Sequence, residues 1–193
     1  MESEEFQSPL GRRVIIVGPS CSGKSTLGAE LGHRLGVPFV ELDALFWKPN
    51  WQESDPEEFR ANLLASHAGD GWVSAGNYLR HTQDVTWPRA DSVIWLDFPL
   101  WLTSWRVLTR SWRRWRRREH LWGTNYERFW DQLKLWSPSD SLIAYTISRH
   151  RRNQRIFTER MKQVRSEDRQ FHRLRSPREL ERFLIGLAEA SET

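Results

Sequence analysis

The residues of this 193-residue chain whose types and spacing suggest chemistry lie near its start. Residues 18–25 read Gly-Pro-Ser-Cys-Ser-Gly-Lys-Ser, which is the pattern of a phosphate-binding loop. Glycines in such a loop let backbone N–H groups turn inward, and the lysine bridges β- and γ-phosphate oxygens. We therefore expect ATP as a ligand, with Mg²⁺ bound to the Ser25 hydroxyl. The residues expected to bind the nucleotide are Gly18, Pro19, Ser20, Cys21, Ser22, Gly23, Lys24, Ser25 and Thr26.

The loop motif requires a strand before it and a helix after it, and the sequence predicts both. Residues 13–17 are mostly β-branched, which favours a buried strand. Leu27, Leu31 and Leu35 recur every four residues, as in a helix that ends at Gly36. This alternation continues and predicts an α/β domain with a parallel sheet flanked by helices. Further strands are expected at 38–42, 72–75, 92–96 and 170–174, and further helices at 55–68, 99–118 and 176–190.

Residues 112–165 do not follow this alternation of strands and helices. They indicate two helices, near 126–135 and 139–162, joined by residues 136–138. We interpret the segment as a helical lid inserted between the fourth and fifth strands. Residues 1–11 form a polar lead, and no repeat or low-complexity linker divides the chain. We therefore expect one domain over residues 1–193.

Composition limits the partners and the compartment that we expect. The net charge is only +4, but residues 106–118 are rich in arginine with tryptophan between, which favours a phosphate-bearing partner. The single cysteine and the absence of a signal-peptide pattern favour a cytoplasmic location. No apolar run approaches the roughly 18 residues of a membrane helix, so we expect no membrane partner. The scattered histidines predict no structural zinc.

Several motifs in chain order resemble adenylate-kinase-like phosphate-loop proteins, particularly the bacterial group labelled "topology modulation protein". The resemblance covers nearly the whole chain after about residue 12. It implies a five-stranded parallel sheet of the nucleoside-monophosphate-kinase type, an acceptor-side helical segment after the second strand, and an arginine-bearing lid after the fourth. The motifs are the loop itself, Leu42-Asp43, Phe46 to Trp51, Gly76-Asn77-Tyr78, and Leu96 to Pro99 followed by Arg106 and Arg110.

The resemblance also implies an acceptor site beside the loop. Asp43 ends the second strand, where a carboxylate orients or deprotonates an acceptor hydroxyl, although a helix cap or a salt bridge is the alternative. Trp47 forms either an aromatic wall for a planar acceptor or part of the core. Asn77 and Tyr78 offer an amide and a phenol to the acceptor, and Arg80 offers a phosphate contact.

Two arginines and one aspartate complete the expected site. Asp97 ends the fourth strand, where it either caps a turn or joins the water shell of Mg²⁺. Arg106 and Arg110 follow it by nine and thirteen positions, as in adenylate kinases. By this resemblance Arg106 lies against the adenine, and Arg110 reaches the transferring phosphate alongside Lys24 and Asp43 as a catalytic residue. Many relatives carry an aspartate where this chain has Ala75, a departure that puts Mg²⁺ organisation in question.

These residues favour an ATP-dependent kinase that uses Mg²⁺ and phosphorylates a nucleoside, a nucleotide or another small molecule at a hydroxyl or phosphate. Two alternatives stay open. One is a nucleotide-regulated nucleic-acid binder that uses the arginines and tryptophans of residues 106–118. The other is a nucleotide switch with low turnover, which the substitution at Ala75 favours. The sequence is compatible with a monomer or a homodimer.

Overall fold

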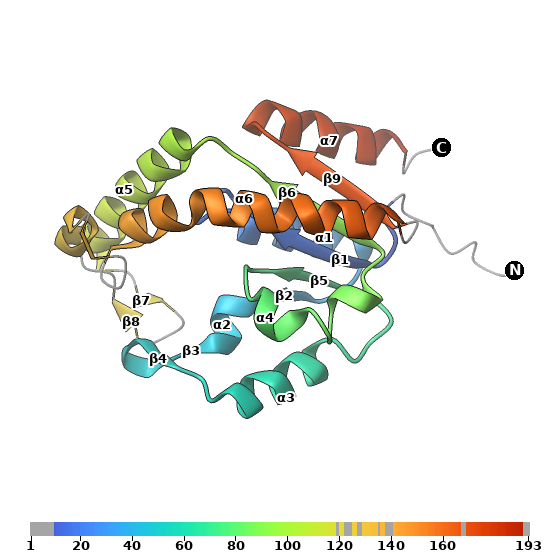
Figure 1. Cartoon of the computed structure of the whole chain (residues 1–193), viewed down its shortest axis with the longest axis horizontal. Helices are drawn as coiled ribbons and strands as arrows, with labels where there is room; N and C mark the ends of the chain where they lie inside the picture. The colour runs from blue at the N-terminus through green and yellow to red at the C-terminus, as the bar shows by residue number, and fades with distance from the viewer. Residues whose placement is uncertain are drawn as a thin grey trace, which may run out of the picture.

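The computed structural model describes residues 10–118, 120–121, 125–126, 129–134, 136–137, 141–166 and 169–190. Its centre is a five-stranded sheet in the order β2-β5-β1-β6-β9, and every neighbouring pair is parallel (Figure 1). All five strands fall where the sequence predicts them, so the expected parallel α/β fold is confirmed. The strands are β1 (Arg13–Val17), β2 (Phe39–Glu41), β5 (Trp72–Ala75), β6 (Ser92–Leu96) and β9 (Gln170–Leu174).

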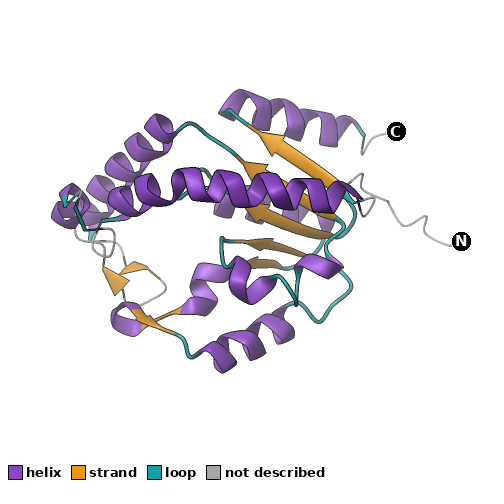
Figure 2. Ribbon diagram, viewed as in Figure 1, coloured by secondary structure: helices purple, strands orange, loops and turns teal. Residues whose placement is uncertain are grey.

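Helices cover both faces of this sheet (Figure 2). The long helix α6 (Leu142–Ser166) crosses one face, while α1 (Lys24–Leu35) lies behind the sheet in the same view. The remaining long helices are α3 (Pro56–Ser66), α5 (Leu100–Arg117) and α7 (Pro177–Glu189).

Strand β1 shows why both faces must be covered. Val14 and Ile16 are buried in a cluster with side chains of α1 and α7. Ile15 and Val17 alternate with them and join a second cluster, which includes Phe157 of α6. Because successive side chains of a strand point to opposite faces, a strand with four consecutive buried apolar residues, 14–17, needs cover on each side.

Local signals fix several helix ends. Gly36 ends α1 with φ 61°, a left-handed conformation that glycine adopts without steric cost. The Asp55 carboxylate caps α3 by accepting the backbone N–H groups of Glu57 and Glu58. Ser176 caps α7 in the same way, since its hydroxyl accepts the Glu179 N–H. Each cap lies where the sequence predicts a helix to begin or end.

The insertion differs from the sequence prediction in its first half. The helix expected at 126–135 is wrong, because β7 (His120–Leu121) and β8 (Asn125–Tyr126) form an antiparallel hairpin that precedes a short 3₁₀ helix, η3 (Phe129–Leu133). The Phe129 ring lies 5.1 Å from that of Trp112 on α5, so aromatic packing against that helix holds this segment. Residues 127–128, 135 and 138–140, together with residues 1–9 of the polar lead, lie outside the described residues.

The second predicted helix of the insertion is present as α6, but its role is broader than that of a lid. Phe157 and Val164 in its C-terminal half are buried against the sheet with Trp95. The same helix also packs against α5 and η3. One helix therefore connects the sheet core to the insertion.

Short elements follow the carboxyl ends of β2 and β5, and the sequence did not predict them separately. They are α2 (Leu42–Phe46), β3 (Trp47–Lys48), η1 (Pro49–Trp51), β4 (Gln52–Glu53), α4 (Leu79–Thr82) and η2 (Trp87–Arg89). Because the carboxyl ends of parallel strands meet at one edge, most of these elements surround the place where ligands bind in such sheets. Among the described residues, no helix combines the length and the apolarity needed to cross a membrane.

Candidate active site

The phosphate-binding loop connects β1 to α1, as its motif requires. Gly18 has φ 151°, and a Cβ there would lie 2.6 Å from the carbonyl oxygen of Leu96, so only glycine fits. Gly23 has φ 99° and precedes the first residue of α1. The loop therefore leads into the N-terminus of a twelve-residue helix, where free backbone N–H groups and the helix dipole favour phosphate.

Lys24 is half-buried at the start of α1, and its ammonium group points into the loop. Its Nζ donates to the carbonyl oxygens of Gly18 and Pro19, each at 2.9 Å. Burial lowers the pKa of Lys24, and the cation of Arg110 lowers it further, whereas the carboxylate of Asp43 opposes the shift. Lys24, Asp43 and Arg110, the three expected catalytic residues, are thus close enough to interact electrostatically.

Ser25 contacts a carboxylate that sequence reasoning missed. Its hydroxyl donates to Oε1 of Glu41 at 2.5 Å, and Glu41 is the last residue of β2. A hydroxyl and a carboxylate at this distance offer the oxygen ligands that Mg²⁺ prefers, so these residues fit a magnesium ion that arrives with nucleotide phosphates. A sequence signal existed, since Glu41 is an acidic residue at the carboxyl end of a predicted buried strand.

Asp43 lies on α2, directly after β2, and its carboxylate is held by a phenol. The Tyr78 hydroxyl donates to Oδ1 of Asp43 at 2.6 Å. Burial raises the pKa of Tyr78 strongly, and the negative charge of Asp43 raises it further, so the phenol stays protonated and remains a donor. The structure thus brings two of the expected acceptor residues together, and no donor among the described residues contacts the second oxygen of the carboxylate.

Asn77 contacts the phosphate-binding loop. Its Nδ2 donates to the Gly18 carbonyl at 2.7 Å, and its Oδ1 accepts the Gly18 N–H at 3.1 Å. These reciprocal bonds tie the end of β5 to the first residue of the loop. An acceptor contact by Asn77 stays a prediction, whereas its contact with the loop is observed.

Asp97 is engaged within the protein. Its side chain is only 7% exposed, and Oδ2 accepts two hydrogen bonds from Arg173, at 2.9 and 2.5 Å. Oδ1 accepts a further bond from Gln154 of α6 at 3.2 Å. These contacts link β6, β9 and α6 beside the site, and a role for Asp97 in the water shell of Mg²⁺ stays a prediction.

The two spaced arginines of α5 have different surroundings. The Arg106 guanidinium lies over the Phe98 ring, 5.6 Å from its centre. Arg110 has a buried Nε that meets no hydrogen-bond acceptor among the described residues. A buried donor without an acceptor is costly, and a phosphate oxygen would satisfy it. This observation fits the predicted role of Arg110 better than a purely structural one.

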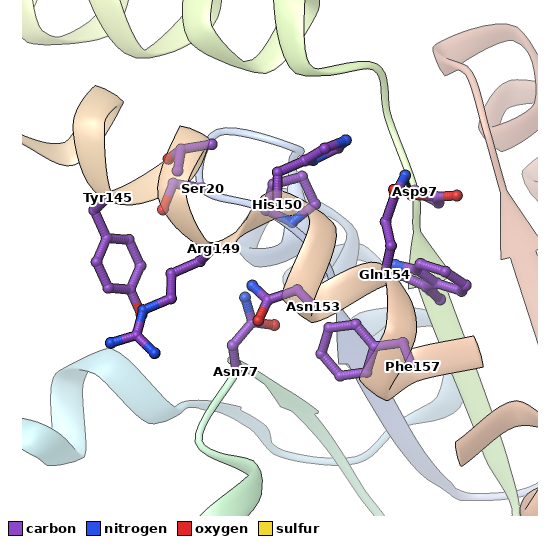
Figure 3. A pocket seen from close by; sticks show the side chains of 12 residues that line it. Ser20, Asn77, Asp97, Tyr145, Arg149, His150, Asn153, Gln154 and Phe157 are labelled. Atoms are coloured by element: carbon purple, nitrogen blue, oxygen red, sulfur yellow. Dashed lines mark hydrogen bonds between the residues drawn. The ribbon is translucent and has the colours of Figure 1, made fainter. Parts of the chain in front are cut away.

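A pocket opens beside the loop, between the strand ends and α6 (Figure 3). Among the arginines of α6, Arg149 lines this pocket. Arg155 instead lines a groove with Arg151 and Arg173. The pocket residues contributed by α6 include Tyr145, Arg149, His150, Asn153, Gln154 and Phe157.

Most of these α6 residues were missed, although a pattern could have found them. Tyr145, Arg149 and Asn153 recur every four residues, which places them on one face of a helix. Figure 3 shows Asn153 beside Asn77, and the adjacent Gln154 beside Asp97. The sequence pattern alone does not show that this face is functional, because that depends on α6 lying over the sheet beside the phosphate-binding loop.

The remaining residues expected on the acceptor side, Trp47 and Arg80, make fewer contacts that indicate a role. The half-buried Trp47 ring makes an edge contact with Phe46 at 5.0 Å and with Trp51 at 5.6 Å. The Phe46 ring in turn lies 4.7 Å from that of Tyr78, so the aromatic group continues to the partner of Asp43. Arg80 is exposed on α4. Its predicted phosphate contact, like that of Thr26 in α1, stays a prediction.

The fold and the loop define an α/β protein with the architecture of a phosphate-loop kinase. Over 45 residues the chain is 47% identical to the shikimate kinase of Synechococcus sp. (strain JA-3-3Ab). That match covers 23% of this chain and 24% of the cyanobacterial enzyme, about a quarter of its length. No family model matches the chain. These findings support a phosphate-loop kinase in general, and the topology modulation protein group stays a prediction.

Proposed function

We propose that the protein is an ATP-dependent phosphotransferase that phosphorylates a hydroxyl group of a small molecule. The observation that carries this proposal is the position of Asp43. Its carboxylate is fixed by Tyr78 at 2.6 Å and interacts electrostatically with Lys24 of the phosphate-binding loop. A carboxylate in that position accepts the proton of a hydroxyl that attacks the γ-phosphorus.

The charges beside the loop favour a hydroxyl over a phosphate as the acceptor. Asp43 and Glu41 both lie close enough to Lys24 to affect its pKa. Two carboxylates at this place would repel a phosphate acceptor, whereas a neutral hydroxyl can donate to either of them. Nucleosides and hydroxylated metabolites are therefore the acceptors of choice. Shikimate belongs among them because the partial relative is a shikimate kinase.

In this mechanism the loop amides hold the nucleotide phosphates. Lys24 exchanges the carbonyl oxygens of Gly18 and Pro19 for β- and γ-phosphate oxygens. The Ser25 hydroxyl would bind Mg²⁺ directly and Glu41 would hold it through water, and the ion would supply charge neutralisation for the phosphates. Arg106 lies against the adenine, and the Arg110 guanidinium donates to the transferring phosphoryl group.

The transfer step exchanges one oxygen–phosphorus bond for another. The acceptor oxygen forms a bond to the γ-phosphorus while the bond to the bridging oxygen of ADP breaks, and the hydroxyl proton passes to Asp43. Trp47 and Arg80 contact the acceptor in this proposal, and Asp97 acts on Mg²⁺ only through water. The α6 face with Arg149 covers the pocket and keeps bulk water from the phosphoryl group.

The proposal is tested by measuring ADP formation with Mg-ATP and a panel of nucleosides, nucleoside monophosphates and hydroxylated metabolites that includes shikimate. Turnover stimulated by a hydroxyl acceptor, and lost in Lys24→Ala and Asp43→Asn, is the expected result. Stimulation by a monophosphate that lacks a free hydroxyl would contradict the choice of acceptor. ATP binding without stimulated turnover would favour the low-turnover switch.

One observation favours nucleic-acid binding as a second candidate function. Trp101, Trp105, Trp112 and Trp115 are 71%, 63%, 45% and 40% exposed. Their spacing places them on one face of α5, and exposed arginines of the same helix flank them. Exposed indole rings beside cations suit stacked bases and a phosphate backbone. Binding of a single-stranded oligonucleotide that weakens steeply with salt would support this function.

The cellular setting forms part of the same proposal. We place the protein in the cytoplasm, as a monomer or a homodimer, with ATP and a small acceptor as its ligands. Sedimentation of the purified chain with and without Mg-ATP measures the oligomeric state directly.

A further inference from the structure

A buried asparagine connects the insertion to the acceptor side of the site. Asn125 lies on β8 of the β7–β8 hairpin and is only 1% exposed. Figure 1 shows this hairpin beside β3 and β4, which belong to the segment that follows β2. Strand β8 also packs against η1, which joins β3 to β4. A buried amide at such a junction needs hydrogen-bond partners, because an unpaired one is costly.

The partners of Asn125 are two backbone groups of the acceptor-side turn, residues 48–51. Its Oδ1 accepts the Trp51 N–H at 2.9 Å, and its Nδ2 donates to the Lys48 carbonyl at 3.2 Å. The amide therefore bridges the two ends of the turn with both of its functions. Among uncharged side chains, only those of asparagine and glutamine carry a donor and an acceptor on one planar amide group, and that of glutamine is one carbon longer.

The turn has a backbone conformation that needs outside support. Asn50 and Trp51 have φ values of 60° and 58°, so two successive residues with side chains are left-handed. Such residues rarely adopt this region, and they do so where surrounding contacts hold them. The bonds from Asn125 attach to Trp51 itself and to the residue two positions before Asn50.

The turn also places the aromatic side chains that lead to the candidate base. The Trp51 ring contacts that of Trp47 at 5.6 Å with an angle of 77° between their planes. Trp47 contacts Phe46, whose ring lies against Tyr78, the hydrogen-bond donor to Asp43. A change in the turn therefore reaches the acceptor wall through contacts between neighbouring rings.

We propose that Asn125 is a positioning residue that fixes the acceptor-side turn and thereby sets acceptor affinity. The inference rests on the proposed function, since it concerns the acceptor of the same site. It makes the insertion part of the acceptor site, although Asn125 is 82 residues from Asp43 in the sequence. Acceptor binding and the packing of the hairpin against the turn are then thermodynamically linked.

The direct test is hydrogen exchange at the Trp51 backbone amide, followed by NMR in the full-length protein. Asn125→Ala removes the acceptor, and we expect Trp51 exchange to accelerate at least tenfold. Asn125→Asp keeps an acceptor oxygen for Trp51 but loses the donor to the Lys48 carbonyl and places a buried negative charge there, so Trp51 exchange should accelerate in this variant too. Asn62→Ala changes an exposed asparagine on α3 and should leave Trp51 exchange unchanged. The Ile16 amide, in the buried strand β1, reports whether each variant is folded.

A kinetic readout separates positioning from a merely structural role. With a productive acceptor, Asn125→Ala should raise the acceptor KM at least threefold and leave the KM for ATP within twofold. Unchanged Trp51 exchange in folded Asn125→Ala would overturn the inference, as would faster exchange with an unchanged acceptor KM. A wild type without acceptor-stimulated turnover would instead defeat the proposed function, so the two failures are distinguishable.

Discussion

Replacing Asn77 by alanine separates two roles for this residue, one at the loop and one at the acceptor. The substitution removes the reciprocal hydrogen bonds to Gly18, at 2.7 and 3.1 Å. A typical hydrogen bond contributes about 1 kcal/mol, so the pair contributes about 2 kcal/mol to the loop conformation that binds phosphate. Because Asn77 is exposed, water replaces part of this contribution. We expect the binding free energy for ATP to weaken by about 1.4 kcal/mol, which is a tenfold increase in the Kd for ATP.

The assay is calorimetric titration of Mg-ATP into wild type, Asn77→Ala and Asn77→Asp at one salt concentration. Asn77→Asp should bind ATP more weakly than Asn77→Ala, because it loses the donor to Gly18 and places a negative charge beside the phosphates. Asn62→Ala serves as the matched control, since its side chain is exposed on α3. An ATP Kd within twofold of wild type in Asn77→Ala, together with a raised acceptor KM, would refute the reasoning.

Three further predictions follow from the same contacts. Because burial lowers the pKa of Lys24, the folded chain binds fewer protons than the unfolded chain in the alkaline range below the ordinary lysine pKa. The free energy of unfolding should therefore rise with pH there in wild type relative to Lys24→Met, as urea unfolding at several pH values will measure. Glu41→Gln should raise the Mg²⁺ concentration for half-maximal turnover about tenfold, and an unchanged value would exclude Glu41 from the water shell. Arg173→Ala leaves the buried Asp97 carboxylate without its ion-pair partner. Because the Arg173 side chain is 26% exposed, water screens part of this pair, and we expect the free energy of unfolding in urea to fall by about 2 kcal/mol. An altered Mg²⁺ dependence with unchanged stability would instead favour a metal role for Asp97.

The parallel sheet was predictable because its signals are local. Strands β1, β2, β5 and β6 are short, mostly apolar runs that end near glycine or an acidic residue, whereas β9 is polar at three of its five positions. The capping residues Asp55 and Ser176 mark where helices begin. The helix predicted at 126–135 failed for a physical reason. Its aromatic residues pack against Trp112 and Trp115 of α5, and contacts between segments far apart in sequence override local helix propensity.

The candidate site was predictable where a motif fixes the geometry, and less so where the fold does. The loop residues and Asp43 follow from pattern and resemblance. Glu41 was missed because its meaning depends on the 2.5 Å contact with Ser25 across two elements. Asn125 was missed because a lone asparagine in an insertion carries no sequence signal until its partners, 74 and 77 residues away, are known.

The measurement that tests the central claim most directly is detection of the phosphorylated acceptor itself by mass spectrometry, after incubation with Mg-ATP and each compound of the acceptor panel. The account predicts one class of hydroxylated acceptor that gains a single phosphoryl group in wild type, with no product in Lys24→Ala and a strongly reduced yield in Asp43→Asn. Undiminished product in Asp43→Asn, or tight ATP binding with no phosphorylated product from any hydroxyl acceptor, would contradict it.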